Sequence, residues 1–122
     1  MHKSRLVALG IDCEGDDLDV AAGFWSAALG RAVTETKGAY AALADRANQP
    51  IVFVQRVAHP SRVHLDIEAD DVEAEVARLE ALGARRIEQV RTWWVMEAPT
   101  GHRFCVVRPQ LGPLGADANQ WP

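Results

Sequence analysis

The sequence has little of what marks secreted, membrane or nucleic-acid-binding proteins. Only two of its 122 residues are cysteines, Cys13 and Cys105, which excludes a disulfide framework and makes a reduced, cytoplasmic setting the expectation. Its apolar runs are shorter than the roughly 18 residues that a membrane-spanning helix needs, and its first residues lack the apolar stretch of a secretory signal. The formal net charge is −4 and there is no basic patch, so neither a nucleic acid nor a membrane is expected as a partner.

One pattern of residues occurs twice along the chain. Apolar residues at three- and four-residue spacing predict helices near Asp17 to Leu29 and near Asp71 to Leu82. Gly30 and Gly83 directly follow these helices, and glycine readily adopts the left-handed conformation that ends many helices. One β-prone segment precedes each helix and three follow it. The expected strands are Leu6 to Cys13, Ala32 to Thr36, Ala39 to Leu43 and Ile51 to Val57 in the first copy, and Val63 to Ile67, Arg85 to Val90, Thr92 to Glu97 and Arg103 to Arg108 in the second.

This repeat predicts an α+β fold built from two βαβββ modules. A chain of 122 residues can bury one hydrophobic core but has no room for a second, so the whole chain is expected to form a single domain. The expected parts are module one at about 5–57, module two at about 62–109 and a tail at 110–122. The tail is expected to be loose unless Trp121 docks on the domain. Asp70, followed by Glu73 three residues later, predicts a capping box at the start of the second helix.

Four short pieces of the chain carry a family resemblance. They are Phe24–Gly30, His64–Asp66, Leu79–Ala84 and Ala98–Cys105. Together, and in this order, they resemble the vicinal oxygen chelate superfamily of glyoxalase I, bleomycin resistance proteins and extradiol dioxygenases, and most of all its small glyoxalase-like domain proteins. The resemblance covers about Arg5 to Pro109, with Ala98 and His102 as departures from the family's closing motif. It implies an open, cup-shaped mixed sheet with helices on one face and a cleft along the other, and it implies a homodimer.

Under this resemblance, strand alternation assigns side chains to the two faces of the sheet. Val63, Leu65 and Ile67 are expected beneath a helix. The residues expected to face the cleft are Leu6, Ala8, Gly10, Asp12, Ile51, Phe53, Gln55, His64, Asp66, Glu68, Cys105 and Val107. Trp93 and Trp94 are adjacent, so one of them faces the cleft and the other a helix, and the sequence alone does not say which.

The resemblance also implies four metal-ligand positions, which fall on Gly10, Phe53, His64 and Cys105. Only His64 is a ligand type that the family uses, and the side chains of Gly10 and Phe53 have no donor atom. We therefore expect no metal, no other cofactor and no glyoxalase I activity. A zinc site made by His64, Asp66 and Cys105 is an alternative, because zinc accepts nitrogen, oxygen and sulfur ligands.

Two functions remain open at this point. The first is metal-free binding of a small apolar or aromatic molecule, because a concave sheet face with few polar groups favours a flat, apolar ligand. Its expected contacts are Phe53, His64, Asp66, Trp93, Trp94, Met96 and Cys105. The second is a lyase or isomerase of the same fold, in which His64 and Asp66 are catalytic. Structural roles are open as well: His64 in a hydrogen bond across the sheet, Asp66 paired with an arginine or orienting His64, and Cys105 as a small buried side chain.

Overall fold

The computed structural model describes all 122 residues and has the α+β fold that the repeat predicts. Its elements are β1 (His2–Glu14), α1 (Leu18–Leu29), β2 (Val33–Lys37), β3 (Tyr40–Leu43), β4 (Ile51–Val57), β5 (Arg62–Ala69), α2 (Val72–Ala81), β6 (Arg85–Val90), β7 (Trp93–Glu97), β8 (Arg103–Val107) and β9 (Asn119–Trp121). Hydrogen bonds join the strands into one mixed sheet in the order β2-β3-β4-β1-β5-β8-β7-β6, and β9 pairs with β1. Both helices and the first eight strands agree with the predicted segments to within a few residues.

The chain divides into two compact units, which we call the α1 unit and the α2 unit after their helices. The α1 unit is Ala8–His64, and the α2 unit combines Met1–Val7 with Leu65–Pro122. Strands β1 and β5 therefore each contribute residues to both units. Neither helix is long and apolar enough to cross a membrane.

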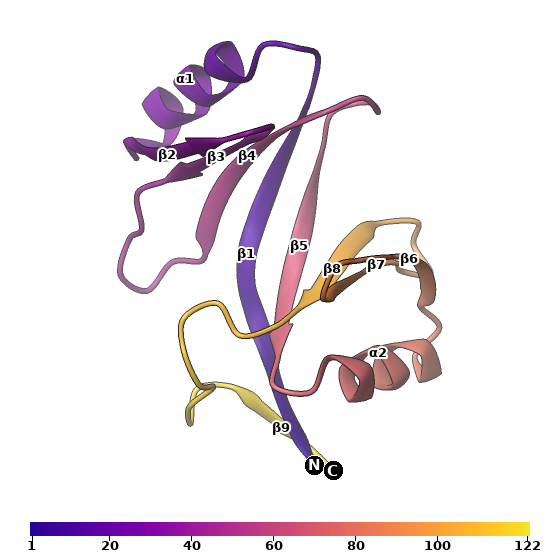
Figure 1. Cartoon of the computed structure of the whole chain (residues 1–122). Helices are drawn as coiled ribbons and strands as arrows, with labels where there is room; N and C mark the ends of the chain where they lie inside the picture. The colour runs from indigo at the N-terminus through magenta and orange to yellow at the C-terminus, as the bar shows by residue number, and fades with distance from the viewer. The chain divides into compact units, whose positions relative to one another are not determined.

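In the α1 unit, helix α1 packs on strands β2, β3 and β4 (Figure 1). The Asp17 side chain caps the helix by accepting a hydrogen bond from the backbone N–H of Val20, and Gly30 ends it with a left-handed φ of 68°. The core beneath the helix consists of Leu18, Ala22, Ala41, Leu43, Val52 and Val54, with Leu9, Ile11 and Cys13 packed against it. Because side chains alternate along a strand, Gly10 of β1 and its register partner Phe53 of β4 lie on the face opposite α1.

In the α2 unit, helix α2 packs on β6 and β8 in the same way (Figure 1). The core beneath it consists of Ala69, Val76, Met96, Phe104 and Val106, with Ile67, Val72, Leu79 and Trp94 packed against it. The predicted cap is one residue too early, because Asp71 is the residue that accepts a hydrogen bond from the Ala74 N–H, at 3.0 Å. Asp70 instead accepts one from the backbone N–H of Lys3, at 2.8 Å, so it holds the start of β1.

Two residues of β5 that were expected beneath a helix are exposed. Val63 and Leu65 are 56% and 44% exposed, whereas Ile67 does pack on the α2 core. The reason is that α1 packs on β2, β3 and β4 and α2 on β6 and β8, so neither helix covers this part of β5. Val63 and Leu65 are alternate residues, and they form an apolar stripe on one side of the strand.

The tail is not loose, because its end forms β9. His2 is opposite Trp121 in the antiparallel register of β1 and β9. The indole N–H of Trp121 donates a hydrogen bond to Ser4 Oγ at 2.9 Å, and the Arg78 guanidinium lies 3.8 Å from the centre of a Trp121 ring. The hydrogen bond satisfies the indole N–H, and the cation–π contact stabilises the position of the aromatic ring.

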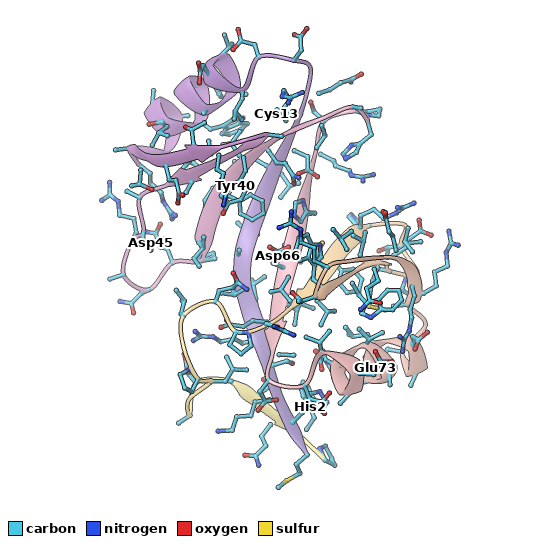
Figure 2. All side chains as sticks on the ribbon, viewed as in Figure 1. His2, Cys13, Tyr40, Asp45, Asp66 and Glu73 are labelled. Atoms are coloured by element: carbon cyan, nitrogen blue, oxygen red, sulfur yellow. The ribbon has the colours of Figure 1, made fainter.

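A fully buried glutamate lies next to this attachment. Glu75 of α2 accepts hydrogen bonds from His2 Nε2 at 2.7 Å and from Arg78 Nε and Nη2 at 2.8 and 2.9 Å, and Figure 2 shows His2 beside α2. Burial raises the pKa of Glu75, but the hydrogen bonds from Arg78, His2 and Ser4 outweigh it and lower the pKa from 4.5 to about 2. Glu75 is therefore held as a carboxylate that joins the start of the chain to α2.

A second buried glutamate, Glu68 of β5, holds the segment before β9. Its Oε2 accepts a hydrogen bond from Arg5 Nε at 2.6 Å, and its Oε1 accepts one from the backbone N–H of Gln110 at 2.7 Å. Arg5 also pairs with Asp117. Residues 110–122 are thus fixed to other parts of the α2 unit at several points along their length.

Candidate functional site

His64 and Asp12 form a buried hydrogen-bonded pair on the face of the α1 unit opposite α1. His64 Nδ1 on β5 lies 2.9 Å from Asp12 Oδ2 on β1. Only 9% of His64 and 5% of Asp12 is exposed. Since an ionised carboxylate can only accept hydrogen bonds, the proton in this contact belongs to the imidazole. The hydrogen bond across the sheet that was one expectation for His64 is therefore present.

Aromatic rings and a glycine enclose the imidazole of His64. The Phe53 ring meets it edge to face, with centroids 5.5 Å apart, and Tyr40 lies 4.9 Å beyond Phe53. Tyr40 points away from α1 (Figure 2). A Cβ atom at Gly10 would be only 2.2 Å from His64 Cε1 and 2.7 Å from Phe53 Cζ. The two rings therefore fill the space that a side chain at position 10 would need.

Asp12 has further basic neighbours and one oxygen without a donor. His59 Nε2 and Arg62 Nε lie 3.8 and 4.0 Å from Asp12 Oδ2, and both of these side chains are partly exposed. Asp12 Oδ1 is buried and accepts no hydrogen bond. A buried acceptor without a donor costs about 1 to 3 kcal/mol, so a group that donates a hydrogen bond at Oδ1 would be stabilising.

In the α2 unit, Asp66 and Cys105 are neighbours in register on the face opposite α2. Asp66 of β5 is opposite Cys105 of β8, which is opposite Val95 of β7. Ile67 and the β8 residues Phe104 and Val106 pack toward α2. Because side chains alternate along a strand, Asp66 and Cys105 project to the opposite face. Asp66 and His64 are alternate residues of β5 and leave the strand on the same side.

Two of the expected ligand contacts lie elsewhere. Met96 has no exposed surface, and Trp94 packs on the same core beneath α2, where Arg86 lies 4.9 Å from its ring. Trp94 and Met96 both point toward α2. Because side chains alternate along β7, Trp93 is the tryptophan on the opposite face. Met96 and Trp94 are therefore removed from the candidate contacts.

The four metal positions implied by the resemblance do not fit a metal. Gly10 and Phe53 offer no donor atom. A longer side chain at position 10 would collide with the His64 imidazole. The same imidazole uses Nδ1 to bind Asp12. The site of the α1 unit is thus arranged around a hydrogen-bonded histidine.

One other group of side chains could hold a metal. His64, Asp66 and Cys105 offer a nitrogen, an oxygen and a sulfur donor, which are ligand types that zinc accepts. Asp66 and Cys105 are register partners. Cys13 is no candidate, because it packs against the α1 core and burial raises the pKa of its thiol.

The sequence patterns did not identify several residues of this site, or gave them no role. Strand alternation placed Asp12 on the correct face, but it did not identify Asp12 as the partner of His64. That pairing depends on how β1 and β5 align, across 52 positions of sequence, and no local pattern encodes that alignment. His59, Arg62 and Tyr40 were also not singled out, because an isolated polar residue in a strand or turn usually faces solvent.

Comparisons with known proteins agree with this fold. The family model described as "Glyoxalase-like domain" matches residues 8–107. A search of curated proteins gave no match. Solved structures similar to this chain include a methylmalonyl-CoA epimerase from Mycobacterium tuberculosis, with a TM-score of 0.66, 18% identity and coverage of 86% of this chain and 87% of that chain. A glyoxalase/bleomycin resistance protein/dioxygenase superfamily member from Vibrio splendidus has a TM-score of 0.52 and 18% identity, with 84% and 98% covered.

A third similar structure is part of a larger enzyme. The extradiol ring-cleaving dioxygenase from B. fuscum has a TM-score of 0.60 and 14% identity, and the match covers 85% of this chain but 32% of that one. Identities this low show a shared fold and leave the activity open. The family match, in contrast, spans most of the chain, from β1 to β8. The protein therefore belongs to the glyoxalase-like domain family.

Proposed function

We propose that this glyoxalase-like domain binds a small, flat and largely apolar molecule without a metal, through the face of the α1 unit opposite α1. The observation that carries the proposal is the buried Asp12 Oδ1, which accepts no hydrogen bond although it lies in a site with His64 and Phe53. A ligand with one hydrogen-bond donor would supply the missing partner. The Phe53 and Tyr40 rings offer the flat apolar surface that a ring-shaped ligand needs.

Further contacts are proposed from the α2 unit. Asp66, Cys105 and Trp93 lie on its face opposite α2, and they remain from the expected set once Met96 and Trp94 are removed. Asp66 would favour a ligand that donates a hydrogen bond or carries positive charge. Trp93 would add an indole surface for stacking.

Two small probes of the same shape test the proposal. p-Cresol has a hydroxyl donor that p-xylene lacks, so we expect p-cresol to bind about five- to tenfold more tightly, which is the typical effect of one hydrogen bond to a buried acceptor. Replacing Phe53 with leucine should weaken p-cresol binding about three- to tenfold, because an aromatic contact is lost. Both affinities can be measured by titrating amide chemical shifts of the labelled protein.

Phe24→Leu is the matched control for this experiment. Phe24 lies on α1 and is 62% exposed, so its replacement should leave the affinity for p-cresol unchanged. Equal affinities for the two probes would contradict the assigned role of Asp12. Equal effects of the two phenylalanine variants would contradict the location of the site.

A second candidate function is a lyase or isomerase that uses His64 for proton transfer. The observation that favours it is the hydrogen bond from His64 to Asp12, because a carboxylate on one ring nitrogen orients an imidazole and increases its basicity at the other. Asp66, two residues along β5, is the second proposed catalytic group. Solvent deuterium exchange at the acidic carbon of a thioester probe, lost in His64→Gln, would distinguish this function from simple binding.

We also propose that the protein is a homodimer. The exposed pair Val63 and Leu65 is apolar surface of the kind that dimers cover. Light scattering at micromolar concentration should therefore give twice the mass of the chain. Leu65→Asp should weaken the dimer at least about tenfold, because it would bury an unpaired charge. Leu111→Asp is the control, since Leu111 is also exposed but lies in the segment before β9; a monomeric wild-type protein would refute the proposal.

A further inference from the structure

We infer that a second copy of this chain docks on the outward face of α1, with the two α1 helices side by side and antiparallel across a two-fold axis. The inference rests on the proposed homodimer and names the surface through which it forms. Three observations carry it: the apolar outward face of α1, the contrast with the outward face of α2, and the opposite charges at the two ends of α1.

Helix α1 is apolar on its outward side as well as on the side that packs on the sheet. All but two of its 12 residues, Asp19 and Ser26, are apolar or glycine. Val20 and Phe24 are four positions apart, so they lie on one side of the helix, and they are 69% and 62% exposed. Ala27, at the next turn, is exposed as well. A helix that is apolar on every side is usually buried, so we expect this outward face to be covered in the assembled protein.

Helix α2 shows that an outward helix face in this chain can be polar. Glu73, Ala77 and Glu80 are exposed on the outward side of α2, and both glutamates pair with Arg86. Helix α1, in contrast, has no charged residue after Asp19. Depletion of charge is typical of the centre of a protein–protein interface, so the two helices differ in the way expected if only α1 is covered by a partner.

Val63 extends the apolar surface from α1 onto the sheet. His64 lies on the face opposite α1, and side chains alternate along β5, so Val63 projects toward the α1 side. It is 56% exposed, because α1 packs on β2, β3 and β4. A second copy that covers α1 would therefore meet Val63 on the same side of the α1 unit.

The two ends of α1 carry opposite charges. The exposed acidic residues at its start are Asp16, Asp17 and Asp19. At its end, the Arg46 guanidinium donates a hydrogen bond to the Gly30 carbonyl, which holds a positive charge beside the last turn. Arg31 directly follows Gly30 and offsets the charge of Asp45. The start of the helix is therefore negative and its end is positive.

These charges make the outward face complementary to itself in an antiparallel arrangement. A two-fold axis between two α1 helices would place the acidic start of each beside the basic end of the other, where opposite charges favour association. The two helix dipoles would also point in opposite directions, which is favourable. Most dimers have a two-fold axis, so the charge pattern indicates a second copy of the chain as the occupant of this face.

Sedimentation equilibrium of the full-length protein over a range of concentrations tests the inference. Phe24→Glu should weaken the dimer at least about tenfold, because it would bury an unpaired charge. Ala77→Glu is the matched control, since it adds the same charge to the exposed face of α2, and it should leave the dissociation constant unchanged. If circular dichroism shows that Phe24→Glu does not fold, Ala27→Glu replaces it with the same expectation.

Charge reversal tests the antiparallel arrangement. Asp19→Arg and Arg46→Glu should each weaken the dimer about three- to tenfold, because two like-charge contacts related by the axis would replace two attractive ones. The double variant restores both contacts with their signs exchanged, so its dissociation constant should return close to that of the wild type.

Three results would overturn the inference: a Phe24→Glu dimer as strong as the wild type, equal weakening by Phe24→Glu and Ala77→Glu, or additive weakening in the charge-reversed double variant. The homodimer proposal can be judged separately. If the wild type is a dimer that Leu65→Asp weakens and Phe24→Glu does not, the homodimer proposal stands and the α1 interface is wrong. A monomeric wild-type protein would refute both.

Discussion

Replacing Gly10 with alanine is expected to lower the free energy of unfolding by about 1 to 3 kcal/mol, a typical cost of overpacking, and to remove p-cresol binding. The new Cβ atom would lie 2.2 Å from His64 Cε1, 2.5 Å from His64 Nε2 and 2.7 Å from Phe53 Cζ, all closer than such contacts allow. Relief requires the imidazole to move, and a displaced imidazole gives up its hydrogen bond to Asp12. Urea denaturation gives the stability, and the chemical-shift titration gives the affinity.

Gly23→Ala separates this effect from the general consequences of changing glycine to alanine. Gly23 lies on helix α1 and has nothing within 4 Å of its hypothetical Cβ, so alanine there should stabilise the protein by about 0.5 to 1 kcal/mol. The two substitutions should thus act in opposite directions. A Gly10→Ala protein as stable as the wild type, with unchanged p-cresol affinity, would contradict the close packing of His64 on β1.

The second large effect is expected at Glu75. Glu75→Gln keeps the size of the side chain but removes the charge that binds His2 and Arg78. The pKa of Glu75 is lowered from 4.5 to about 2, which corresponds to about 3 kcal/mol of stability at neutral pH. Removing one partner of a buried ion pair usually costs about this much. Urea denaturation at pH 7 should therefore show the variant to be less stable by about 3 kcal/mol.

The difference in the free energy of unfolding between wild type and Glu75→Gln should decrease as the pH falls. A carboxyl group whose pKa is lower in the folded than in the unfolded state stabilises the fold fully above the unfolded value, here about 4.5. This contribution decreases as the pH falls, and it is lost once the pH is below the pKa of Glu75 in the folded state, about 2. The two proteins should thus be well separated at pH 7, closer at pH 3.5 and nearly equal at pH 2.

Glu73→Gln is the control for Glu75. Glu73 is on the same helix, but its side chain is 67% exposed and pairs with Arg86, and exposed pairs contribute only about 0 to 1 kcal/mol. A loss of stability in Glu75→Gln that is no larger than in Glu73→Gln, or that persists unchanged at pH 2, would contradict the buried ion pair.

The fold could be predicted from sequence where local patterns determine it. Asp17, Gly30 and Gly83 mark helix ends by capping and backbone preference, and these preferences act over a few residues. Strand β9 was missed because three residues carry no periodicity. Its position depends on Trp121 meeting Ser4 and Arg78, which are distant in sequence.

The candidate site was predictable only in part, for a related reason. His64 stands out within a family motif, and alternation alone placed it with Asp66 on one side of β5. Met96 could not be placed, because alternation along β7 allows either of two sets of residues to face the helix. Only the packing against α2 shows that Trp94 and Met96 are the set that does so. The partner of His64 could not be named, because the pairing of β1 with β5 is set by the assembled sheet and not by either strand.

The division of β1 between the two units has a consequence for how the chain folds during synthesis. On the ribosome, all residues of the α1 unit have been made once His64 is complete. The first seven residues belong to the α2 unit, so they must wait for residues made much later. Their last partner, Trp121 opposite His2, is separated from them by nearly the whole chain, and such distant pairings form slowly. The α1 unit is therefore expected to mature first, while residues 1–7, which are made before it, are among the last to reach their native contacts.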